Sequence, residues 1–223
     1  MTHTFKKKRH YRELYHRILA FYKAGLNYPG TFIVLGIRNI DVLYEYYNLY
    51  AIAEIFRQKF GNSDLQLGEN KILYFTFSSN QETYRVYYQL RINRKNFPST
   101  YPWIKLFANS NLSKFFCPDI VIEKEEDGEF RYAILDAKYS SKYWVTGTTF
   151  YTIVGKYNFS ISFRDEPYKK VDYLYLLYPD DGPSDILTKD KGYYPEMGAI
   201  PSIPSNVKPL ITTILHILKG WEK

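Results

Sequence analysis

Two apolar runs joined by a tight-turn signal constrain the fold of this chain more than any other feature of its sequence. They span residues 115–123 and 130–139, and the linker between them, Lys-Glu-Glu-Asp-Gly-Glu, contains an Asp-Gly pair. Asp-Gly is favoured in two-residue hairpin turns because both residues tolerate positive φ angles. The pattern therefore predicts a β-hairpin whose two strands lie side by side.

The remaining residues show helical or strand-like spacing of their apolar side chains. The predicted helices span residues 7–24, 40–60, 148–163 and 209–219. The other predicted strands span residues 71–77, 83–92 and 171–178. Helices at both ends of a largely antiparallel centre indicate one α/β or α+β domain, and we expect an α/β fold with a central mixed or antiparallel sheet flanked by helices.

The chain has 223 residues, enough for one domain with a sizeable core. We therefore expect residues 1–223 to form a single domain, in which residues 1–37 are an N-terminal helical extension. Six of the eleven prolines lie between positions 179 and 209. Because proline interrupts helices and sheet ladders, residues 179–209 are predicted to form a long loop or a series of turns before the C-terminal helix over residues 209–219.

Charge and composition restrict the partners of the chain more than its activity. Lys and Arg number 30 against 23 Asp and Glu, which gives a net charge of +7 and favours a polyanionic partner, although many proteins with this charge bind no nucleic acid. Aromatic residues make up 19% of the chain; they can stack on bases, but we expect most to fill sheet faces. The lack of a long apolar stretch or a signal-peptide pattern, together with a single cysteine, predicts an intracellular, cytoplasmic protein with no membrane contact.

Three ionisable side chains are brought together by the predicted hairpin. Asp119 is expected on its first strand, and Asp136 and Lys138 at the end of its second. Side chains alternate along a strand, so Asp136 and Lys138 point to the same face, and strand pairing brings Asp119 alongside them. Two carboxylates beside an ammonium suit a hard cation such as Mg²⁺ acting on a phosphate ester. The alternative is a solvent-facing ion pair on an ordinary hairpin.

These residues resemble the motif of the PD-(D/E)xK nuclease superfamily. The motif is read as Pro-Asp at residues 118–119, a gap of 16 residues, and Asp-Ala-Lys at residues 136–138. The strings Cys-Pro-Asp-Ile-Val-Ile (117–122) and Tyr-Ala-Ile-Leu-Asp-Ala-Lys-Tyr (132–139) look like the nuclease domain of McrC-like restriction proteins. This closer resemblance covers residues 38–178.

The resemblance implies a restriction-endonuclease-like core and a Mg²⁺-dependent endonuclease that hydrolyses DNA in restriction, defence or DNA processing. Asp119 and Asp136 would bind Mg²⁺, with Mn²⁺ as a substitute, and Lys138 would position the attacking water. A helix before the sheet often supplies a third acid in the superfamily, and Glu45 is the matching position, its alternative being a helix-surface acid. The candidates for contact with DNA are Lys156, Tyr157, Lys142 and Arg38.

Other readings of the sequence stay open. The same fold could serve a non-catalytic nucleic-acid-binding or assembly subunit, and no residue excludes RNA as the substrate. McrC-like proteins typically work with a nucleotide-hydrolysing ring; this chain has no P-loop, so it is either a stand-alone nuclease or the partner of a separate motor subunit. A double-strand cut needs two active sites, which a homodimer would supply. The four histidines lack zinc-binding spacing, and Cys117 is expected to pack rather than react.

Overall fold

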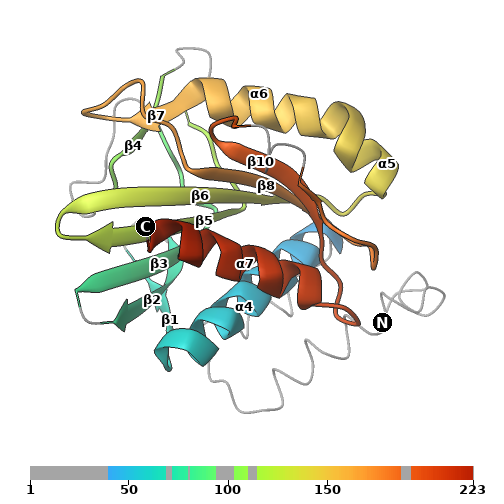
Figure 1. The fold of residues 1–223 in the computed structure, drawn as a ribbon, viewed down its shortest axis with the longest axis horizontal. Coiled ribbons are helices and arrows are strands. Elements are labelled where there is room, and N and C mark those ends of the chain that lie inside the picture. Colours follow the sequence, from blue (N-terminus) through green and yellow to red (C-terminus); the bar gives the residue numbers. More distant parts are fainter. Residues whose placement is uncertain are drawn as a thin grey trace.

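An eight-stranded mixed sheet runs through the centre of the structure, a computed structural model that describes residues 40–68, 72–79, 81–93, 103–109, 115–186 and 192–222 (Figure 1). The strands lie in the order β1-β2-β3-β5-β6-β8-β10-β9. They are β1 (Leu65–Leu67), β2 (Leu73–Ser79), β3 (Glu82–Tyr88), β5 (Ile120–Glu126), β6 (Glu129–Ala137), β8 (Tyr173–Tyr178), β9 (Asp185–Ile186) and β10 (Glu196–Pro201). Each pair of neighbouring strands from β1 to β6 is antiparallel. The strands β6, β8 and β10 run parallel to one another, and β9 is antiparallel to β10. The expected α/β class with a mixed sheet is confirmed.

The central hairpin predicted from the sequence is confirmed as β5–β6. Its turn lies at Asp127 and Gly128, which both have positive φ angles, 50° and 82°. One detail of the prediction is wrong, because Asp119 lies immediately before β5 instead of on the strand. Pro118 precedes it and has no backbone N–H to donate to a ladder, so regular pairing begins only at Ile120.

Helices cover both faces of the sheet (Figure 1). One face carries α4 (Ile40–Phe60) and α7 (Lys208–Trp221). The other face carries α5 (Lys142–Trp144), a segment kinked at Gly147 (Val145–Thr149), α6 (Phe150–Ser160) and a small sheet of β4 (Leu106–Ala108) and β7 (Ile161–Phe163). Side chains of β6 alternate between the two layers: Ala133 and Leu135 join the core under α4 and α7, and Ile134 joins the core under α6. The same alternation places Asp136 on the α6 side.

Two predicted segments differ from the structure. The helix expected over residues 148–163 ends at Ser160, because the next three residues form β7 and pair with β4. Residues 179–209 are not one long loop, since they contain β9 and β10, and β10 pairs in parallel with β8. Pro195 immediately precedes β10, and Pro201 is its last residue. Prolines at both ends of a short strand usually indicate turns, which is why the sequence predicted a loop here.

The other predicted elements agree with the structure to within a few residues. The helices expected over 40–60 and 209–219 are α4 and α7, the second hairpin is β2–β3, and the buried strand is β8. The helix predicted over residues 7–24, the extension over residues 1–37 and Arg38 lie outside the described residues. Within the described ranges, no helix is both long and apolar enough to cross a membrane.

Candidate active site

Asp119 is held where three strands end side by side. Its backbone carbonyl accepts a hydrogen bond of 2.9 Å from the N–H of Gln89, the residue after β3. Its carboxylate Oδ2 accepts a hydrogen bond of 2.8 Å from the N–H of Ala137, the last residue of β6. The residue is 8% exposed. Backbone geometry therefore fixes this carboxylate at the end of the β5–β6 hairpin.

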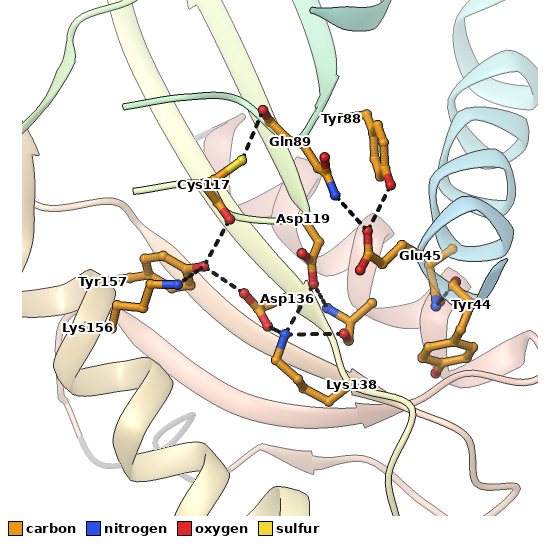
Figure 2. Close-up of polar contacts among 12 residues, drawn as sticks. Tyr44, Glu45, Tyr88, Gln89, Cys117, Asp119, Asp136, Lys138, Lys156 and Tyr157 are labelled. Carbon is orange, nitrogen blue, oxygen red and sulfur yellow. Dashed lines mark hydrogen bonds and ion pairs between the residues drawn. The ribbon is translucent and has the colours of Figure 1, made fainter. Parts of the chain in front are cut away.

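Asp136 and Lys138 form a cluster with Asp119, which we call the acid cluster (Figure 2). Asp136 is 1% exposed, and its Oδ1 contacts the ammonium group of Lys138. The Lys138 Nζ also lies 3.3 Å from Asp119 Oδ2. The backbone N–H of Lys138 donates to the carbonyl of Leu177 on β8 at 2.8 Å, so the chain keeps its extended path one residue beyond β6. The structure thus brings together the three residues that the sequence placed on one hairpin.

Burial and like charge dominate the electrostatics of this cluster. Burial, followed by the charge of Asp136, raises the pKa of the Asp119 carboxyl, and the Lys138 ammonium opposes that rise only in part. Burial by itself lowers the pKa of Lys138, but the charges of Asp136 and Asp119 outweigh it and raise that pKa above its ordinary value. Lys138 therefore carries its positive charge at neutral pH and acts as a fixed cation beside the two carboxyl groups.

Tyr157 of α6 fixes the position of Asp136 from the other side. Its hydroxyl donates a hydrogen bond of 2.8 Å to Asp136 Oδ2, and the Nζ of Lys156 lies 3.1 Å from the same hydroxyl. Burial and the neighbouring Asp136 raise the pKa of Tyr157, so its hydroxyl keeps the proton that it donates. Tyr157 is buried, and its contact with DNA stays a prediction. Its contact in this structure is with the carboxylate.

Glu45 reaches the acid cluster from α4. Its Oε2 accepts hydrogen bonds from the Tyr88 hydroxyl at 2.8 Å and from Gln89 Nε2 at 3.0 Å. Its charge contributes to the raised pKa of Asp119, and Figure 2 shows the Asp119 carboxylate lying between Glu45 and Asp136. The predicted third acid is therefore close to the cluster, and two hydrogen bonds from β3 and the residue after it hold its carboxylate there.

The oxygen donors of these three acids suit a hard divalent cation. Among the described residues, however, no three His, Cys, Asp or Glu side chains lie close enough together to hold a metal ion as they stand. The Lys138 ammonium contacts both aspartates and supplies the single positive charge between them. With all groups ionised, Glu45 and the acid cluster carry three negative charges and one positive charge. The donor set fits Mg²⁺ or Mn²⁺ in charge and chemistry, provided that the Lys138 ammonium withdraws from between the aspartates.

The remaining predicted contacts to DNA have different surroundings. Lys156 is exposed on α6, and its ammonium lies 4.7 Å from the centre of the Tyr157 ring, beside the acid cluster. Lys142 pairs with Asp185 of β9 at 2.8 Å, so its charge is already balanced. Arg38 is outside the described residues. Lys156 is thus the one of these candidates that the described residues place next to the acids.

Two features of the site were missed in the sequence, namely the hydrogen bond from Tyr157 to Asp136 and the support of Glu45 by Tyr88 and Gln89. Each joins residues more than 20 positions apart, so no local pattern could have indicated it.

Cys117 behaves as expected, because burial and the neighbouring Asp119 raise the pKa of its thiol to about 11, which keeps it protonated and unreactive.

Comparison with known proteins adds no relative to this description. No protein-family model, no curated protein and no solved structure matches the chain. A functional assignment therefore depends on the geometry of the acid cluster and on the sequence motif.

Proposed function

We propose that this protein is a Mg²⁺-dependent endonuclease that hydrolyses phosphodiester bonds in DNA on a restriction-endonuclease-like core. The observation that carries the proposal is the meeting of Asp119, Asp136 and Lys138 at the ends of β5 and β6. Two buried carboxylates and a charged lysine form a costly arrangement for stability alone, because buried charges lose their hydration. Such clusters of perturbed groups are typical of catalytic sites.

Each residue has a distinct role in this proposal. Asp119 and Asp136, with Glu45 beside them, would hold Mg²⁺ or Mn²⁺, and the bound cation would supply positive charge for the phosphate and make a nearby water more acidic. Lys138 keeps its proton, so it orients the attacking water and stabilises negative charge that develops on the phosphate. Tyr157 keeps Asp136 in one orientation. The net charge of +7 supports affinity for the DNA backbone.

Cleavage of plasmid DNA by the wild type and by Asp136→Asn tests this function. We expect nicking or cutting with Mg²⁺ or Mn²⁺, none in EDTA, and none with the variant, because the amide cannot replace the carboxylate charge. Asp165→Asn is the matched control, since Asp165 is exposed and far along the chain from the acid cluster. Full activity of a clean, folded Asp136→Asn preparation would refute the assignment.

One observation favours the alternative of a nucleic-acid-binding or assembly subunit without catalysis. The Lys138 ammonium already balances part of the charge of both aspartates, so the cluster has a partner without a metal. If the wild type cleaves nothing, calorimetric titration with Mn²⁺ separates the two functions. Binding of Mn²⁺ that is lost in Asp136→Asn supports a nuclease that needs a motor or targeting partner. Absence of binding, with DNA shifted equally in EDTA and in Ca²⁺, supports the binding subunit.

A further inference from the structure

Gln89, the residue after β3, has an unusual backbone conformation beside the acid cluster. Its φ angle is 49°, and Asp127 is the other residue with a positive φ, apart from glycines, in the described part of the chain. Glycine, asparagine and aspartate accept the left-handed region most easily, whereas a residue such as glutamine adopts it less readily. Asp127 lies in the Asp-Gly turn of the β5–β6 hairpin, where this conformation is expected. Gln89 therefore has a backbone conformation that its residue type disfavours.

Hydrogen bonds connect Gln89 to two of the three acids (Figure 2). Its backbone N–H donates to the carbonyl of Asp119 at 2.9 Å, and its side-chain Nε2 donates to Glu45 Oε2 at 3.0 Å. Its own carbonyl accepts a hydrogen bond of 3.2 Å from the thiol of Cys117. Gln89 therefore ties the segment that carries Asp119 to the carboxylate that comes from α4.

The carboxylate of Glu45 is held through one of its two oxygens. The Tyr88 hydroxyl donates to Oε2 at 2.8 Å, and the Gln89 amide donates to the same atom. Among the described residues, no hydrogen bond or ion pair reaches Oε1 of Glu45. Two donors on Oε2 restrict rotation of the carboxylate, and a carboxylate oxygen without a donor can accept a cation. Oε1 is therefore the oxygen that Glu45 can offer to a ligand.

The hydrogen bond from Gln89 to Glu45 adds little to the stability of the fold. Gln89 is exposed, and so is this hydrogen bond. Water can replace an exposed donor, so such a bond does little to offset the cost of the left-handed backbone. Disfavoured backbone conformations that the surrounding structure holds in place are frequent at functional sites. The reach of the glutamine amide to Glu45 is the feature that a glycine at this position would lack.

We propose that Gln89 is a positioning residue, whose amide holds the Glu45 carboxylate beside Asp119 so that Glu45 Oε1 serves as a third oxygen ligand of a divalent cation. The inference rests on the proposed nuclease function, because it concerns the metal site of that function. Gln89 itself contacts neither the cation nor DNA in this role. It acts only through Glu45, which distinguishes it from a ligand.

Calorimetric titration with Mn²⁺, together with thermal melting in EDTA, tests this role in Gln89→Gly. We expect the melting temperature to stay nearly unchanged, because relief of the left-handed conformation offsets the greater freedom of glycine in the unfolded chain. The Mn²⁺ affinity should fall about tenfold, the lower end of the losses seen when a group that supports a metal ligand is removed. Asp127→Gly is the matched control, since it makes the same backbone change at the opposite end of the β5–β6 hairpin and should alter neither quantity.

A double variant shows whether Gln89 acts through Glu45. In Glu45→Ala the ligand is gone, so adding Gln89→Gly should lower the Mn²⁺ affinity no further, whereas independent effects would add. An additive loss, or equal Mn²⁺ affinities of Gln89→Gly and the wild type, would overturn the inference. A large fall in the melting temperature of Gln89→Gly that Asp127→Gly does not share would identify a structural role instead.

Failure of this inference is separate from failure of the nuclease. If Asp136→Asn abolishes Mn²⁺ binding and Gln89→Gly leaves it unchanged, only the role of Gln89 is disproved. If Gln89→Gly weakens Mn²⁺ binding as expected but the wild type cleaves no DNA, the positioning role stands and the nuclease does not. A wild type that binds no Mn²⁺ disproves the role of Gln89 together with the metal site.

Discussion

Lys138 stands between two buried carboxyl groups, and its charge is the main compensation for their repulsion. Its ammonium contacts both Asp119 and Asp136, while the hydroxyl of Tyr157 and the N–H of Ala137 supply the neutral donors. Burial and, after it, the charge of Asp136 raise the pKa of Asp119. When both aspartates are ionised, they carry two negative charges against the one positive charge of Lys138, and a divalent cation would balance the difference at the cost of displacing the lysine side chain.

Replacing Lys138 should expose this competition between lysine and metal. In EDTA, Lys138→Met leaves the aspartates without a cation, and we expect a lower melting temperature, since breaking a buried ion pair costs about 3–5 kcal/mol when the charge remains. Mn²⁺ should raise the melting temperature of Lys138→Met more than that of the wild type. Lys142→Met, which removes a partly exposed lysine paired with Asp185, is the control and should change little. Equal Mn²⁺ shifts in variant and wild type would argue against a metal site at these acids.

Tyr157 should matter for metal binding because its hydroxyl holds the Asp136 carboxylate in place. Tyr157→Phe frees Asp136 Oδ2, and loss of such a supporting partner typically lowers metal affinity or activity about 10- to 100-fold. Tyr178→Phe is a matched control, because the buried hydroxyl of Tyr178 has no hydrogen-bond partner among the described residues. We expect Mn²⁺ affinity, measured by calorimetry, to fall for Tyr157→Phe and to stay unchanged for Tyr178→Phe. A similar result for both variants would mean that Tyr157 only fills space.

At the scale of secondary-structure elements, sequence patterns predicted the elements that are determined by residues close together in the chain. The β5–β6 hairpin was predictable because an Asp-Gly turn and two apolar runs are adjacent in the sequence, and the spacing of Asp136 and Lys138 follows from the two-residue period of a strand. β10 was missed because its stability comes from parallel pairing with β8 across an irregular connection, and prolines stand at its ends. The contacts of Tyr157 and Glu45 were missed for the same reason, since packing of helices against the sheet creates them.

β3 and β5 are joined by a buried ion pair that should give the fold a measurable pH dependence. Arg85 contacts Glu123 at 2.7 Å, and burial raises the pKa of Glu123 from 4.5 to about 7 despite this charge. Between these two pH values Glu123 keeps its proton in the folded protein but loses it in the unfolded chain. The contribution of Glu123 to the free energy of unfolding is therefore complete below about pH 4.5 and is lost as the pH rises through 7.

Denaturant unfolding of the wild type and Glu123→Gln between pH 5 and 8 measures this effect. The glutamine cannot ionise, so the free energy of unfolding of the wild type, relative to that of Glu123→Gln, should fall across this range by roughly 3 kcal/mol for a shift of this size. Changes at other carboxyl groups cancel in the difference. Glu125→Gln removes the partly exposed carboxylate that also contacts Arg85, so it separates burial from loss of an ion pair. A constant difference between wild type and Glu123→Gln would contradict the prediction.

At the scale of the whole molecule, the acid cluster lies where both layers of the fold meet the sheet. Glu45 comes from α4 on one face, Tyr157 from α6 on the other, and Asp136 lies near the carboxyl end of β6, beside the parallel strand β8. Carboxyl ends of parallel strands are a common location of binding sites, because helices and connections converge there. The fold therefore supplies side chains from several elements to one place while the hairpin keeps the aspartates fixed.

Each chain contributes the acid cluster once, and this predicts the order in which DNA strands are cut. In the proposed nuclease, one cluster would hydrolyse one strand at a time, and the charge of +7 opposes self-association. Supercoiled plasmid should therefore first become open circles and only later linear DNA, at a rate proportional to protein concentration. Gel analysis of the time course at several protein concentrations measures both. Linear product that appears together with open circles, at a rate rising with the square of the concentration, would instead identify a homodimer as the cutting species. Mixing wild type with Asp136→Asn decides the case, because mixed dimers would nick without linearising, whereas monomers would only be diluted.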